Sequence, residues 1–105
     1  MLINGEWLKP DDNKCFWSTN PATSDQLARV VDGGADHATL AIDAAASAFP
    51  AWSATTAYQR AELLGKAREN VLARAADIVR LMSEEQGKPL RAALTEVRYA
   101  ADFLG

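Results

Sequence analysis

Residue types that carry catalysis are few in this chain of 105 residues and lie far apart. The one cysteine, Cys15, belongs to a β-prone run with Phe16 and Trp17. The only cation beside it in the sequence is Lys14. A nucleophilic thiolate needs a base, a cation or a helix N-terminus to favour its ionised form. These neighbours favour a structural Cys15 over a nucleophilic one.

The single histidine and the carboxylates do not form a catalytic pattern. His37 falls in the first turn of an expected helix, with no second histidine or cysteine to complete a metal site. Glu84 and Glu85 are adjacent rather than facing, as on a solvated helix surface. Together with Glu96 they are the carboxylates placed most nearly for acid–base work. We expect no catalytic residue within the chain.

The glycines do not predict a nucleotide site. The chain contains neither Gly-x-Gly-x-x-Gly nor a Walker loop, and its only adjacent glycines are Gly33 and Gly34. They stand between an expected strand and an expected helix, where a phosphate could bind in principle. Asp36 would place a carboxylate where that phosphate should lie. We interpret the glycine pair as a turn that ends a strand.

Composition limits the class of protein. The chain is 49% hydrophobic and 24% charged with a net charge of −3, as in one small globular domain without a nucleic-acid or anionic-membrane partner. No apolar run approaches the ~20 residues that span a bilayer. No N-terminal stretch has the pattern of a signal peptide, because residues 1–3 are followed at once by Asn-Gly-Glu-Trp. One cysteine fits a reducing compartment. We expect a cytoplasmic protein that binds neither nucleic acid nor membrane.

The first third of the chain has the pattern of short strands. Asn4-Gly5 suits a tight hairpin between Leu2-Ile3 and Trp7-Leu8. Turn-forming residues then separate two longer runs. The predicted strands are residues 15–19 and 26–31, and the predicted turns are residues 10–13 and 20–25.

From Asp36 onward the apolar residues recur with a helical period. Asp36 is expected to cap a first helix with an alanine-rich face, and Pro50 to end it. Thr56 and Gln59 form a capping-box pattern at the start of a long helical stretch with one apolar face, and Gly87 is expected to end it. The stripe exceeds the usual helix length, so we expect a break near Ala73. Its apolar members are Leu64, Ala67, Val71, Ala75, Ile78 and Met82.

A last helix is expected to begin near Leu90 and to reach Gly105, with Leu94, Val97 and Ala101 on one face. The apolar pair Phe103-Leu104 stands at the end of the chain, where solvated residues are usual. This pattern is typical of an interrupted chain.

Five stretches, in order and at matching spacing, resemble the N-terminal region of the aldehyde dehydrogenase superfamily. Residues 80–90 look most like bacterial succinate-semialdehyde dehydrogenases. The stretches are residues 3–7 (INGEW), 20–23 (NPAT), 44–52 (AAASAFPAW), 85–90 (EQGKPL) and 96–104 (EVRYAADFL).

The resemblance implies an α+β fold of N-terminal β-hairpins followed by three or four helices. Residues 1–105 would form the first part of a Rossmann-like cofactor-binding domain, without the catalytic and oligomerisation domains. In this family a cysteine attacks the aldehyde, hydride passes to NAD or NADP, and a glutamate activates water. The family's nucleophile and base lie downstream, and Cys15 does not correspond to that nucleophile. The chain alone is therefore expected to be inactive and to bind no cofactor.

Some family members hold a monovalent cation through main-chain carbonyls before the Asn-Pro turn and through an acid further on. The matching positions are Ser18, Thr19 and Glu96, and oxygen ligands suit a hard cation. A solvated helical glutamate is the alternative for Glu96.

The resemblance also implies partners: the remainder of the dehydrogenase chain or homologous subunits. The alternative is a stand-alone module that binds a full-length dehydrogenase subunit. Because uncovered helix faces can cost more than the roughly 5–15 kcal/mol that stabilises a domain, we expect the isolated chain to be partly molten, to self-associate, or to repack its helices on its hairpins.

Overall fold

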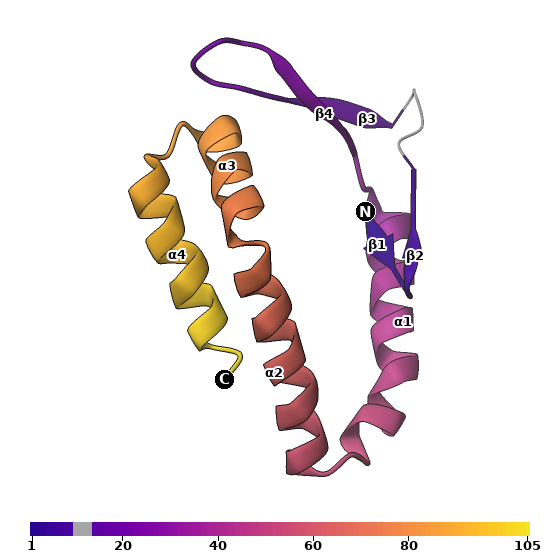
Figure 1. Cartoon of the computed structure of the whole chain (residues 1–105). Coiled ribbons are helices and arrows are strands. Elements are labelled where there is room, and N and C mark those ends of the chain that lie inside the picture. The colour runs from indigo at the N-terminus through magenta and orange to yellow at the C-terminus, as the bar shows by residue number, and fades with distance from the viewer. Residues whose placement is uncertain (10–13) are drawn as a thin grey trace. The chain divides into compact units, whose positions relative to one another are not determined.

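The computed structural model describes residues 1–9 and 14–105, which divide into two compact units (Figure 1). The first unit contains residues 1–18 and 28–55, and the second contains residues 19–27 and 56–105. Two short antiparallel hairpins and four helices make up the fold, so the predicted α+β class is confirmed. The turn predicted at residues 10–13 lies outside the described residues.

The first hairpin pairs β1 (Leu2–Ile3) with β2 (Glu6–Trp7). Leu2 lies opposite Trp7 and Ile3 opposite Glu6. Asn4 and Gly5 both have positive φ angles, 52° and 79°, as the predicted tight turn requires. The hairpin is confirmed, although β2 begins one residue earlier than the sequence suggested.

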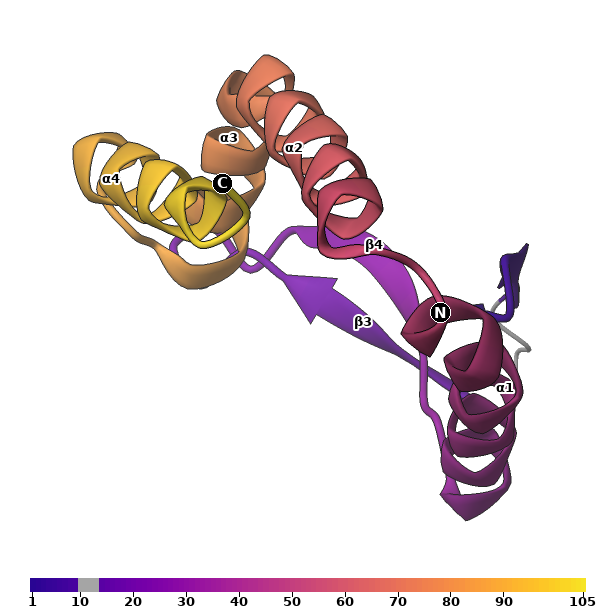
Figure 2. The same ribbon diagram turned by 90° about the horizontal axis from the view of Figure 1, so that it is seen from below.

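The second hairpin pairs β3 (Cys15–Thr19) with β4 (Gln26–Val31), as predicted (Figure 2). At its open end the Asp32 N–H donates to the Lys14 carbonyl over 2.9 Å. At its tip the Asn20 N–H donates to the Asp25 carbonyl over 2.9 Å, and the Asn20 side chain accepts from the Ala22 N–H. The predicted turn at residues 20–25 is therefore closed by local hydrogen bonds.

Helix α1 (Ala35–Ser53) differs from its prediction at both ends. Gly34 occupies the N-cap in an extended conformation, so Asp36 is not the cap but an acid of the first turn, favourably placed in the helix dipole. Pro50 lies inside the helix rather than after it. Proline cannot donate the hydrogen bond to the preceding turn, but its carbonyl still accepts hydrogen bonds from the Ser53 hydroxyl and the Ala54 N–H. The helix therefore continues for one more turn.

The second unit is built from α2 (Ala57–Ala73), α3 (Ala75–Gln86) and α4 (Leu90–Asp102). The capping box is confirmed: the Thr56 hydroxyl accepts from the Gln59 N–H, and the Gln59 side chain accepts from the Thr56 N–H. The predicted break is confirmed at Arg74, which separates α2 from α3 with φ −102° and ψ 13°. Both ribbon views show α4 running beside α3 (Figures 1 and 2).

A small apolar core joins α3 to α4. Val79, Ala93 and Val97 are 8%, 0% and 4% exposed. The alanine lets the two helix backbones approach closely, because a larger side chain would separate them. The partly buried residues that pack around this core are Val71, Ala75, Ile78, Met82 and Leu94.

Helix α4 ends at Asp102 rather than reaching Gly105. The Leu104 N–H donates to the Ala101 carbonyl over 3.0 Å, three residues back instead of four. Such a tightened last turn satisfies a terminal carbonyl that has no α-helical partner. The prediction for this end was therefore wrong by about one turn.

Gly87 ends α3 in the left-handed region, with φ 68°, and its N–H donates to the Ser83 carbonyl. Gly87→Ala is expected to destabilise the second unit by about 1–2 kcal/mol, the cost of a left-handed residue with a Cβ. A Cβ there would meet the Pro21 ring at 3.5 Å, an ordinary contact, so backbone strain is the whole effect.

Gly65→Ala is the matched control, because Gly65 lies within α2 and a Cβ there meets nothing within 4 Å. It should raise stability by about 0.8–1 kcal/mol. Urea denaturation followed by circular dichroism measures both changes. If both substitutions changed the free energy of unfolding in the same direction, the assignment of Gly87 as a left-handed cap would be contradicted.

Candidate functional site

The three residues predicted to hold a monovalent cation occupy different elements. Ser18 and Thr19 end strand β3, and Ser18 is half-buried while Thr19 is exposed. Glu96 stands in the middle of α4. Ser18 belongs to the first unit, whereas Thr19 and Glu96 belong to the second. The cation site remains a prediction.

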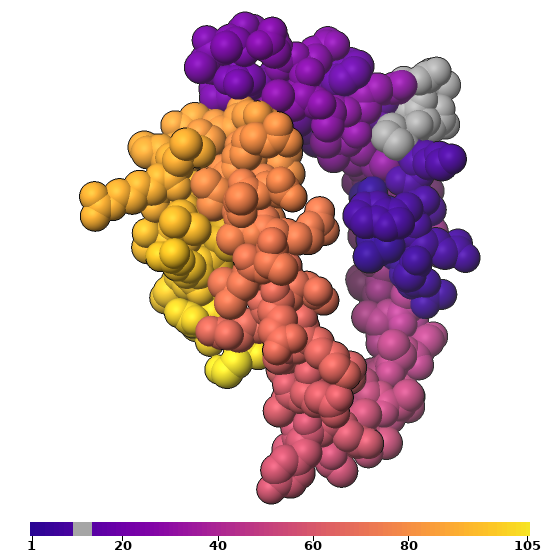
Figure 3. All heavy atoms as spheres, viewed as in Figure 1, coloured from indigo at the N-terminus to yellow at the C-terminus, as the bar shows by residue number. Residues whose placement is uncertain are grey.

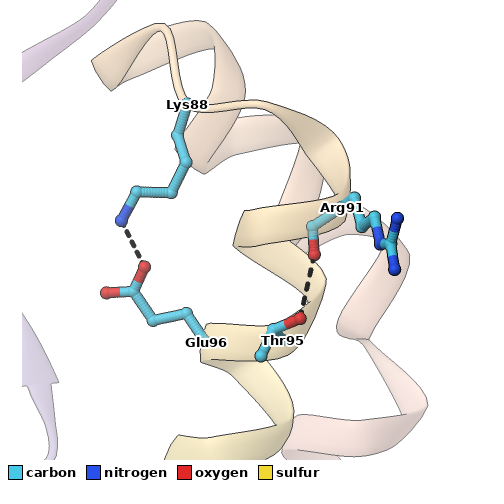
Figure 4. Close-up of polar contacts among 4 residues, drawn as sticks. All are labelled: Lys88, Arg91, Thr95 and Glu96. Atoms are coloured by element: carbon cyan, nitrogen blue, oxygen red, sulfur yellow. Dashed lines mark hydrogen bonds and ion pairs between the residues drawn. The ribbon is translucent and has the colours of Figure 1, made fainter.

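The carboxylate of Glu96 accepts a hydrogen bond from the Lys88 ammonium (Figure 4). Lys88 lies in the loop between α3 and α4, and its side chain is 28% exposed against 53% for Glu96. In Figure 4 the two side chains point toward one another, while the Arg91 side chain points away. The Glu96 carboxylate is thus paired with an ammonium in this structure.

Cys15 has a cation beside it that the sequence did not reveal. Its sulfur accepts from Arg29 Nη2 over 2.7 Å and from Arg29 Nε over 3.2 Å. Arg29 stands on β4 across from β3, fourteen residues away, so only the pairing register could have indicated this contact. Two donors from one guanidinium hold the thiol in place and tie β3 to β4.

The glycine pair lies between β4 and α1, as expected for a turn that ends a strand. A hollow of about 250 Å³ there is lined by Lys14, Asp32, Gly34, Asp36 and His37. Two carboxylates in so small a space disfavour a phosphate, even though the start of α1 faces it. These residues do not fit the pyrophosphate of a dinucleotide.

The carboxylates of Glu84 and Glu62 lie on helix surfaces and pair with basic residues of the same helix. Glu84 lies 3.9 Å from Arg80 on α3. On α2, a 2.7 Å hydrogen bond from Lys66, together with its charge, lowers the pKa of the Glu62 carboxyl, and Glu62 raises the pKa of Lys66 in return. Both are largely exposed, so this is an i,i+4 surface pair.

Among residues 1–9 and 14–105, no three acidic, histidine or cysteine side chains lie together as metal ligands. Within the same residues, no helix has the length and apolar character needed to cross a membrane.

Many apolar side chains of the described residues are exposed to solvent. None of the nineteen residues of α1, all of them described, is buried. Ile42 and Phe49 on α1 are 67% and 65% exposed. Such faces usually mark a surface that another element covers.

The chain is similar to known proteins along nearly its whole length. The profile of the aldehyde dehydrogenase family matches residues 7–105. Succinate-semialdehyde dehydrogenase (NADP(+)) GabD of Escherichia coli K12 is 47% identical over 98% of the chain. The glutarate-semialdehyde dehydrogenase of Pseudomonas putida is 43% identical over 97%. The chain spans about a fifth of each relative, 21% in both cases.

Solved structures give the same result. An Escherichia coli NADP-dependent enzyme superimposes with a TM-score of 0.93 at 47% identity, over 98% of this chain and 21% of its own. Succinate-semialdehyde dehydrogenase from Burkholderia pseudomallei follows with a TM-score of 0.90 at 39% identity, over 96% and 21%. The hairpins and helices described above therefore recur as the N-terminal part of much longer chains.

Proposed function

Since this chain belongs to the aldehyde dehydrogenase family, we propose that it forms the N-terminal part of an NAD(P)-dependent enzyme that oxidises an aldehyde to a carboxylic acid. The observation that carries the proposal is 47% identity to GabD across 98% of the chain, with a TM-score of 0.93 to an NADP-dependent enzyme. Residues 1–105 would be the first part of the cofactor-binding domain. The catalytic and oligomerisation domains would come from further sequence.

The names of the relatives suggest the substrate class. Succinate semialdehyde and glutarate semialdehyde each carry an aldehyde at one end and a carboxylate at the other. We propose a small semialdehyde of this kind, with succinate semialdehyde as the first candidate. The aldehyde pocket would be built from residues beyond this region.

Residues 1–105 alone are expected to be inactive and to bind neither NAD nor NADP. Oxidation requires a thiolate, an activated water and a bound nicotinamide in one site. Arg29 places a cation beside Cys15, but Cys15 does not correspond to the nucleophile of the family, and the Gly33-Gly34 hollow is flanked by carboxylates. We assign the chemistry and the cofactor to the remainder of the enzyme.

The uncovered apolar faces support the remainder of the dehydrogenase, or a homologous subunit, as the partner. A stable domain must bury such stripes, and about four-fifths of the length of GabD lies outside the matched region and could do so. The exposed faces equally favour the alternative, a module that binds a full-length dehydrogenase subunit. Co-elution of the chain with intact GabD would support that alternative.

We also propose that Ser18, Thr19 and Glu96 contribute to a monovalent-cation site in the assembled enzyme. Carbonyl and carboxylate oxygens suit a hard cation. The Glu96 carboxylate, which accepts from Lys88 through Oε2, would supply an oxygen ligand to that cation.

A chimaera tests the proposed function. The segment of GabD that aligns with this chain is replaced by residues 1–105, and oxidation of succinate semialdehyde with NADP is measured. We expect activity and NADP binding close to those of GabD, because the exchanged segment is 47% identical to GabD and shares its fold with an Escherichia coli NADP-dependent enzyme.

The matched control is a chimaera in which residues 56–105 are in scrambled order, which keeps composition and length. It should be insoluble or inactive. A native chimaera that folds but neither binds NADP nor oxidises the aldehyde would refute the proposal.

A further inference from the structure

We draw no further inference here: the strongest candidate, the apolar hollow where α4 lies against α2 and α3 (Figure 3), carries nothing because nothing in the structure shows what covers it.

Discussion

Ala93→Asp is expected to abolish the packing of α4 on α3. Ala93 has no exposed surface and stands at the centre of the core with Val79 and Val97. An aspartate there would bury a carboxylate among apolar side chains and force the helices apart. A buried charge without a partner costs about 3–5 kcal/mol, a large part of the roughly 5–15 kcal/mol that stabilises a whole domain. We therefore expect most of the helical circular-dichroism signal of α3 and α4 to disappear.

Ala92→Asp is the control, because Ala92 is the neighbouring residue on α4 and is exposed. It introduces the same charge and the same loss of helix propensity, and should change stability by under about 1 kcal/mol. The same pair can be tested in the GabD chimaera, where only Ala93→Asp should remove activity. Equal loss from both substitutions would mean that α4 does not pack through the face that contains Ala93.

Local chemistry explains why many elements could be predicted from the sequence. The Asn4-Gly5 turn, the Thr56–Gln59 capping box and the Gly87 cap each depend on residues within three or four positions of one another. The break between α2 and α3 followed from length alone. Motif order also identified the family, because several short patterns at fixed spacing are far more specific than any one of them.

The sequence did not predict the features that depend on competing interactions or on residues far apart in the chain. Helix α1 continues through Pro50 because the hydrogen bonds of the next turn outweigh the one that proline cannot donate. The general preference of proline for helix ends does not reveal this balance. The contact of Arg29 with Cys15 depends on strand register. The pairing of Lys88 with Glu96 depends on how the α3–α4 loop turns back.

We propose that the rest of a dehydrogenase chain covers the apolar faces of these helices. Covalent continuity is not required for such a contact, since association with a complementary surface stabilises a folded unit by mass action. The 105-residue chain should therefore bind, in trans, a GabD from which the aligned N-terminal segment has been removed. The shortened GabD alone should be inactive, because its own apolar surface is left uncovered.

The most direct measurement is NADP reduction with succinate semialdehyde when the two purified pieces are mixed. The aligned segment of GabD itself serves as the positive control, and the chain carrying Ala93→Asp as the negative one. We predict that residues 1–105 restore activity in a saturable, concentration-dependent way and that Ala93→Asp prevents it. Restoration by the GabD segment but not by residues 1–105, at any ratio of the two pieces, would contradict the claim.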